Sequence, residues 1–171
     1  MLKKCRKKIS NRVAFLIIEP KSYEFKPKER LLREKVGEYG FDSIHFVYFH
    51  DSAIDDPENL TADFENMKEK IFEMVEKEYG LIFTVGGIGL DRDDFVPEAT
   101  LAITDKRLYG METALFNFME KVSEDFAFRR PIIAIRKKSI IMNLPEEFEY
   151  IEKILDFFLP RLKKFLQIST N

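Results

Sequence analysis

The chain has 171 residues, of which 45% are hydrophobic and 34% are charged, so it holds enough apolar material for one domain with a packed core. Its 28 basic and 30 acidic residues give a net charge of -2, which excludes the basic field that draws a protein to nucleic acid. A single cysteine excludes an internal disulfide, and no apolar run reaches the roughly 18 residues that a membrane span needs. The composition therefore predicts a cytoplasmic protein that partners neither nucleic acid nor a membrane.

The first third of the chain predicts two strands and a helix. Residues 1–11 form a basic tail, and residues 12–18 form a short apolar run that is typical of a strand buried on both faces. Apolar residues at helical spacing predict a helix over residues 27–40, and residues 44–49 predict a second strand. Residues 50–62 are polar and predict a loop or insertion that is long for a compact α/β unit.

The rest of the chain continues this alternation. The expected elements are a helix over residues 64–80, a strand over 81–85, a helical stretch that opens at 97–100, a helix over 111–122, strands over 131–135 and 139–143, and a C-terminal helix over 146–167. Pro160 is expected to kink or break the last helix because proline lacks the backbone N–H. The alternation predicts a single α/β domain over residues 12–171, a three-layer α/β/α sandwich around a mostly parallel sheet.

Ligands of open parallel sheets collect at the carboxyl ends of the strands, near a switch in strand order. Three segments follow predicted strands in this way, namely residues 19–20, 86–94 and 143–145. The sequence therefore indicates these three segments as candidate ligand-binding places.

The glycines of this chain gather in one loop. There are only seven in all, where average usage predicts about 12, yet Gly86-Gly87-Ile88-Gly89 holds three of them directly after a strand. Such a loop lets backbone N–H groups approach an anionic or ring-shaped ligand without a Cβ in the way. The spacing fits neither the dinucleotide-binding fingerprint nor the P-loop, because no Gly-Lys-Ser/Thr follows.

Charged side chains follow the loop and recur later in the chain. The carboxylates of Asp91, Asp93 and Asp94 can hold Mg²⁺ through water and substrate oxygens, or they can simply cap the next helix. Arg129 and Arg130 form a pair of the kind that recognises phosphate, and placement on an ordinary surface is the alternative.

Two longer strings resemble a known family. Residues 84–100, Thr-Val-Gly-Gly-Ile-Gly followed by Asp-Arg-Asp-Asp and Pro-Glu-Ala-Thr, resemble the signature of the molybdopterin-binding (MoaB/MogA/MoeA-like) family. Residues 134–145, which end in Asn-Leu-Pro, are similar to the second block of that family, and residues 159–162 are similar to the Leu-Pro-x-Leu of its last helix.

The resemblance implies a domain that binds molybdopterin. In the adenylyltransferase branch of this family, AMP from Mg-ATP is joined to the terminal phosphate of the pterin, and the family assembles as trimers or hexamers. By the resemblance, Asp94 is the catalytic residue and holds Mg²⁺ together with Asp93. The substrate-binding residues that it implies, for a pterin or a nucleotide, are Gly86, Gly87, Ile88, Gly89, Glu98, Arg130, Asn143 and Pro145.

Several positions depart from the family pattern. Ile88 and Val96 replace threonines, Asp93 replaces an arginine, and Glu146 replaces the glycine after Asn-Leu-Pro. The string Gly-Gly-Ile-Gly with Asp93-Asp94 is also how the loop reads in CinA-type domains, some of which cleave nucleotide pyrophosphates with the help of a metal. Three hypotheses follow, namely a molybdopterin adenylyltransferase, a CinA-like metal-dependent nucleotide pyrophosphohydrolase, and a catalytically inactive binding protein with the same fold.

Overall fold

The computed structural model describes residues 9–19, 25–50 and 56–168. Its elements in chain order are β1 (Arg12–Glu19), the short 3-10 helix η1 (Lys26–Lys28), α2 (Glu29–Glu38), β2 (Asp42–His50), η3 (Pro57–Asn59), α3 (Leu60–Glu76), β3 (Leu81–Val85), α4 (Val96–Ile103), β4 (Lys106–Arg107), α5 (Tyr109–Met119), η4 (Glu124–Phe128), β5 (Ile133–Arg136), β6 (Ser139–Leu144) and α6 (Phe148–Ile168).

One sheet of six strands organises the described part of the chain, in the order β2-β1-β3-β6-β5-β4. The strands β2, β1, β3 and β6 run parallel, whereas β5 is antiparallel to both of its neighbours. The prediction of a mostly parallel sheet is therefore confirmed. The strand β4 is not predicted from the sequence, because a strand of two basic residues carries no alternating pattern.

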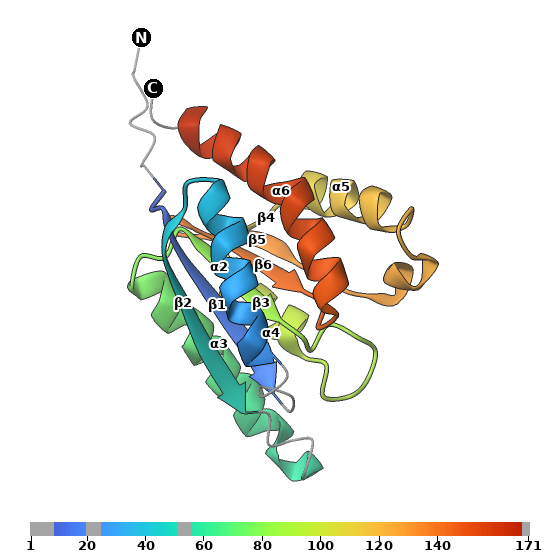
Figure 1. The fold of residues 1–171 in the computed structure, drawn as a ribbon. Helices are drawn as coiled ribbons and strands as arrows, with labels where there is room; N and C mark the ends of the chain where they lie inside the picture. The colour runs from blue at the N-terminus through green and yellow to red at the C-terminus, as the bar shows by residue number, and fades with distance from the viewer. Residues whose placement is uncertain (1–8, 20–24, 51–55, 169–171) are drawn as a thin grey trace.

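Helices cover both faces of this sheet, which confirms the three-layer architecture. The helices α2, α5 and α6 lie on one face and α3 and α4 on the other (Figure 1). Alternate side chains of β1 pack into the two layers: Phe15 on the side of α2, α5 and α6, and Leu16 on the side of α3 and α4. Both side chains are fully buried. Burial of each contributes about 1.5–3 kcal/mol, so the apolar run that predicted the strand also fixes it between the helices.

Two predicted features differ in the structure. The polar segment 50–62 is partly helical, since α3 already begins at Leu60, and Thr61 and Ala62 lie on the exposed side of this helix. Residues 51–55 lie outside the described part.

The predicted break at Pro160 is absent, because α6 runs through this residue without interruption. Pro160 itself is exposed, while its neighbours Leu159 and Leu162 are buried. Packing on both sides of the proline therefore holds the helix together. No helix in the described part of the chain combines the length and the apolar character that a bilayer span requires.

Candidate functional site

Three of the strand ends named as candidate places meet at one edge of the sheet. Ile17 of β1 pairs with Val85 of β3, and Val85 pairs with Leu144 of β6. The Gly86 N–H then donates to the Leu144 carbonyl at 3.0 Å. The glycine loop and the Asn-Leu-Pro segment therefore lie side by side at the carboxyl edge. Pro20 lies outside the described residues.

The glycine loop is tightly shaped at two of its positions. Gly87 has φ +66, and a Cβ there would lie 2.6 Å from Cγ2 of Val96. Its carbonyl also accepts a hydrogen bond from the Val96 N–H at 3.2 Å, which joins the loop to the start of α4. At Gly89 a Cβ would lie 2.5 Å from the Asp94 Oδ2 atom. At Gly87 the positive φ and the close Val96 side chain together favour glycine, whereas a side chain at Gly89 would require the Asp94 carboxylate to move.

Ile88 holds the loop from the inside. Its side chain is only 2% exposed and belongs to the core cluster on the α3 and α4 side of the sheet. Its carbonyl accepts a hydrogen bond from the Arg130 N–H at 2.9 Å. The side chain of Ile88 is thus committed to packing, and a substrate contact at this residue would have to come from its backbone.

Asp94 lies directly against the loop. Its Oδ2 accepts a hydrogen bond from the Asp91 N–H at 2.9 Å, and the residue is half-buried. Asp93 is also half-buried, and its carbonyl accepts from the Phe95 N–H at 3.0 Å just before α4. Among the described residues, no group of three or more histidines, cysteines and carboxylates is arranged to hold a metal ion. The structure therefore offers two neighbouring acidic residues and no complete metal cage.

Arg130 braces the loop against α4. Its Nε donates to the Gly89 carbonyl at 2.7 Å, its Nη2 donates to the Asp94 carbonyl, and its Nη1 pairs with Glu98 on α4. All three nitrogens of the guanidinium are thus engaged within the protein. In this geometry Arg130 and Glu98 hold the loop against α4. The resemblance implies an anion contact for Arg130 and, for Glu98, either orientation of the loop or a substrate contact.

Asn143 lies in a closed hydrogen-bond network behind the loop. It is fully buried, its Oδ1 accepts from the Ile132 N–H at 3.1 Å, and its Nδ2 donates to the Thr84 and Thr100 hydroxyls at 2.8 and 2.9 Å. The side-chain amide of Asn143 therefore links β6 to β3 and to α4. Pro145 follows β6 and is buried, while Glu146 is exposed.

A cavity of about 730 Å³ opens beside the loop, between the start of α3 and the start of α4. Of the predicted residues, Asp94, Glu98 and Arg130 line it. Its apolar wall is not among the predicted site residues and consists of Leu60, Phe64, Leu90 and Phe95. Helical spacing placed Phe64 on the apolar face of its helix. Only the packing of α3 beside the loop shows that this side chain borders a cavity.

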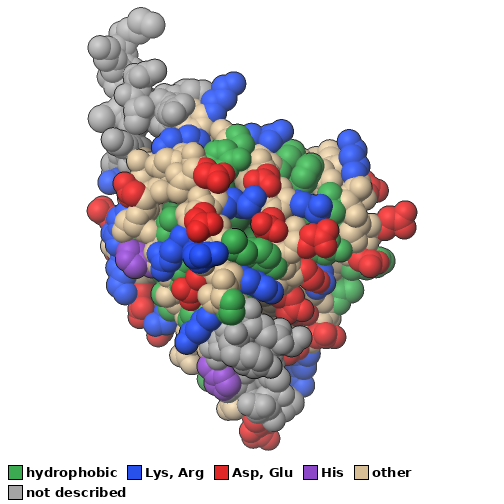
Figure 2. All heavy atoms as spheres, in the orientation of Figure 1, with side chains coloured by type: hydrophobic (Ala, Val, Ile, Leu, Met, Phe, Trp, Pro, Cys, Tyr) green, Lys and Arg blue, Asp and Glu red, His purple; other side chains and the backbone are tan. Residues whose placement is uncertain are grey.

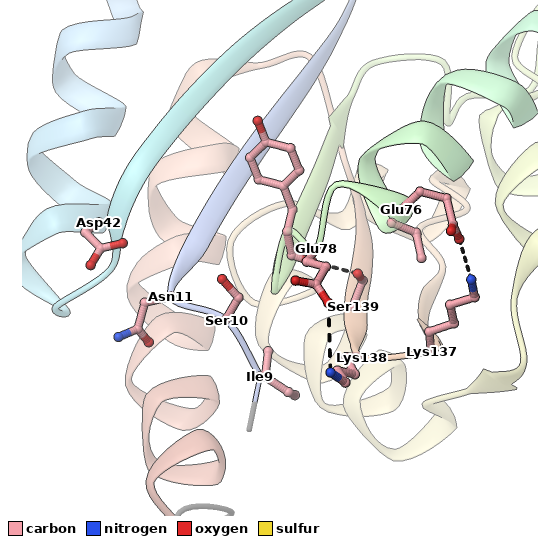
Figure 3. A pocket seen from close by; sticks show the side chains of 11 residues that line it. Ile9, Ser10, Asn11, Asp42, Glu76, Glu78, Lys137, Lys138 and Ser139 are labelled. Carbon is pink, nitrogen blue, oxygen red and sulfur yellow. Dashed lines mark hydrogen bonds and ion pairs between the residues drawn. The ribbon is translucent and has the colours of Figure 1, made fainter. Parts of the chain in front are cut away.

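A second cavity of about 780 Å³ lies at the opposite edge of the sheet, around the start of β1, the end of α3 and the β5–β6 turn (Figure 3). Its lysines are paired with its own glutamates: Lys137 contacts Glu76 at 2.5 Å, and Lys138 lies 4.0 Å from Glu78. No predicted site residue lines this cavity. The cavity at the carboxyl edge is the better candidate, because Asp94 lines it together with Leu90, the residue that follows the glycine loop.

The fold and this site together define a class: an α/β/α domain whose glycine loop, at the carboxyl edge of a mostly parallel sheet, adjoins a cavity with a carboxylate on its rim. A family model described as "Probable molybdopterin binding domain" matches residues 29–164. The chain belongs to this family.

Individual relatives agree with this assignment. The chain is 29% identical over 100 residues to a protein named gephyrin from Dictyostelium discoideum, and 30% identical over 116 residues to a molybdopterin adenylyltransferase from Haemophilus influenzae. These alignments cover 58% and 62% of the chain, but only 14% and 57% of the two relatives.

Solved structures show the same fold. A molybdopterin biosynthesis protein from Mycobacterium abscessus superimposes with a TM-score of 0.77 at 19% identity, covering 93% of this chain and 96% of that one. A CinA protein of unknown function from Thermoplasma acidophilum superimposes with a TM-score of 0.53 at 13% identity, covering 92% and 98%. The prediction of family and fold is confirmed.

Proposed function

We propose that this protein acts in molybdenum cofactor biosynthesis, where it binds molybdopterin and transfers AMP from Mg-ATP to the terminal phosphate of the pterin. The observation that carries the proposal is the position of Asp94, whose carboxylate lies against Gly89 of the glycine loop and on the rim of the cavity. Family membership and relatives named molybdopterin adenylyltransferase support the choice of substrates.

Each part of the site suits one part of these substrates. The Gly86 N–H is bonded to the Leu144 carbonyl, so the N–H groups of residues 87–89 are the ones suited to phosphate oxygens. The apolar wall around Phe64 and Phe95 is suited to a planar ring. The rings of these two phenylalanines pack edge to face, with 6.2 Å between their centroids. Transfer would form a bond from the pterin phosphate oxygen to the α-phosphorus of ATP and release pyrophosphate.

The residues present fit Mg²⁺ in one binding mode. Mg²⁺ often takes one or two carboxylates from the protein and its other ligands from substrate phosphates and water. Asp94, with Asp93 as the second carboxylate, matches that mode, and the lack of a three-ligand cluster in the described part does not conflict with it. Bound there, the ion would neutralise charge that develops on the phosphates during transfer.

Asp94→Asn tests this proposal. Asparagine can still accept the hydrogen bond from the Asp91 N–H, so the variant removes the charge and keeps the turn. With Mg-ATP and molybdopterin, we expect wild type to form adenylylated pterin and the variant to lose on the order of 100-fold in rate. Asp42→Asn, an exposed change at the opposite edge of the sheet, is the matched control and should keep full activity.

The second candidate function is that of a CinA-like metal-dependent nucleotide pyrophosphohydrolase. The observation that favours it is the loop itself, where an isoleucine with a buried side chain is followed by Asp93-Asp94. Release of AMP from ADP-ribose, without adenylylation of the pterin, would select this function. Molybdopterin binding without either reaction would select the third hypothesis, a binding protein that has lost its chemistry.

A further inference from the structure

Arg129 and Arg130 have very different surroundings, although they are adjacent in sequence. The three guanidinium nitrogens of Arg130 contact Gly89, Asp94 and Glu98. Among the described residues, Arg129 makes a single side-chain ion pair, from Nη2 to Oε1 of Glu147. Its side chain is 29% exposed and that of Glu147 is 36% exposed, so solvent reaches this pair.

The guanidinium of Arg129 lies beside the glycine loop. A Cβ built on Gly89 would lie 3.5 Å from the Nη1 atom of Arg129 and 2.5 Å from Oδ2 of Asp94. Arg129 and Asp94 thus approach the same face of the same glycine, one with a positive charge and one with a negative charge. A phosphate that enters beside Gly89 would meet an arginine fork next to the carboxylate that is suited to its magnesium ion.

The ion pair with Arg129 satisfies only part of the hydrogen-bonding capacity of the Glu147 carboxylate. Its Oε1 pairs with Arg129, but its Oε2 is buried and has no hydrogen-bond partner in the described structure. A carboxylate oxygen that has lost water without gaining a donor weakens the ion pair to which it belongs. Glu147 lies two residues after Pro145, at the entry to α6, so it stands where the Asn-Leu-Pro segment borders the loop.

We infer that Arg129 is the phosphate-binding arginine of this site and that Glu147 is its internal competitor, which a phosphate group of the incoming nucleotide or pterin displaces. The inference rests on the proposed function for the identity of the ligand. The exchange replaces one anion on the guanidinium by another. A phosphate can engage both outer nitrogens of the fork, whereas the Glu147 carboxylate pairs with one of them in this structure.

The test measures Mg-ATP and pyrophosphate binding by calorimetry on the full chain. We expect Glu147→Gln to tighten binding about tenfold, because it removes the competing charge, and Arg129→Gln to weaken binding by about tenfold or more. Arg129→Lys keeps the charge and loses the fork, so it should fall in between. Glu149→Gln, which alters a neighbouring exposed glutamate of α6, is the matched control and should bind as wild type does.

The opposite signs separate binding from mere support of the fold. If the pair were only structural, both variants would lower the melting temperature and shift affinity in the same direction, and that result overturns the inference. Wild-type affinity in Arg129→Gln overturns it as well, even where the protein adenylylates molybdopterin. Opposite shifts in a protein that forms no adenylylated pterin uphold the inference and overturn the proposed function. A wild-type protein that binds neither probe overturns the inference.

Discussion

At the scale of single residues, the site depends on how closely Gly89 and Asp94 approach each other. The methyl group of an alanine at position 89 would meet the Asp94 carboxylate at 2.5 Å, so that carboxylate must move. The glycine therefore does more than allow a turn, because it sets the position of the side chain to which the proposed chemistry is assigned.

Gly89→Ala is expected to lower the affinity for Mg-ATP while the domain stays folded, because the displaced group is the end of a side chain at the edge of the sheet. Gly110→Ala is the control. Position 110 lies in α5 with no atom within 4 Å of the added Cβ, so this change should raise the free energy of unfolding by about 0.5–1 kcal/mol. Unchanged nucleotide affinity in Gly89→Ala would contradict the assignment of the site.

Asn143 provides the contrasting case, a predicted substrate contact that the structure surrounds with protein. Removing its amide in Asn143→Ala leaves the Thr84 and Thr100 hydroxyls and the Ile132 N–H without this partner. We expect the free energy of unfolding to fall by about 1–3 kcal/mol in urea titrations. Asn117→Ala, an exposed change on α5, should have little effect. A fully stable Asn143→Ala that has lost only its ligand would instead place Asn143 in the binding site.

At the scale of elements, the short β4 strand is held by charges around the β5–β6 turn. The Lys137 N–H donates to the Asp105 carboxylate at 2.8 Å, and Arg136 pairs with the same carboxylate at 2.6 Å. The Lys137 N–H and then Arg136 lower the pKa of Asp105 below its ordinary value of 3.8. Asp105 thus joins the segment before β4 to the hairpin that follows it in the sheet.

The lowered pKa gives a pH dependence with a defined sign. A carboxyl whose pKa is lower in the folded state than in the unfolded state stabilises the fold above the unfolded value, and it loses that effect as the pH falls through the folded value. Asp105→Asn should therefore melt at a lower temperature than wild type at pH 7, and the difference should shrink below pH 3.8. A difference that grows on acidification would contradict this account. Asp125→Asn, on η4, is the exposed control.

A comparison of the predicted with the observed elements shows which features depend on local sequence alone. Apolar runs and glycines indicated β1, β2, β3 and the loop because these features depend on neighbours in the chain. The strand β4 and the roles of Ile88, Asn143 and Arg130 depend on partners far away in sequence, such as Thr84 for Asn143 and Gly89 for Arg130. Residue types alone could not separate a substrate contact from a side chain that braces the loop.

At the scale of the whole molecule, the small net charge does not strongly attract a ligand of either sign. Basic and acidic side chains are interspersed on the face shown in Figure 2, in keeping with a net charge of -2. Local geometry must therefore select the ligand, and the two cavities at opposite edges of the sheet provide distinct places for it. Assembly into a trimer or hexamer, which the resemblance implies, stays a prediction that sedimentation velocity can check.

The most direct test of the account is a crystal structure of the protein with molybdopterin and Mg-ATP or AMP bound. We expect the ligand phosphates beside the loop of residues 86–89, next to Asp94, and a ring of the ligand against Phe64 and Phe95. A ligand bound in the cavity at the opposite edge, or a crystal soaked at saturating concentration that shows none at the loop, would contradict the account.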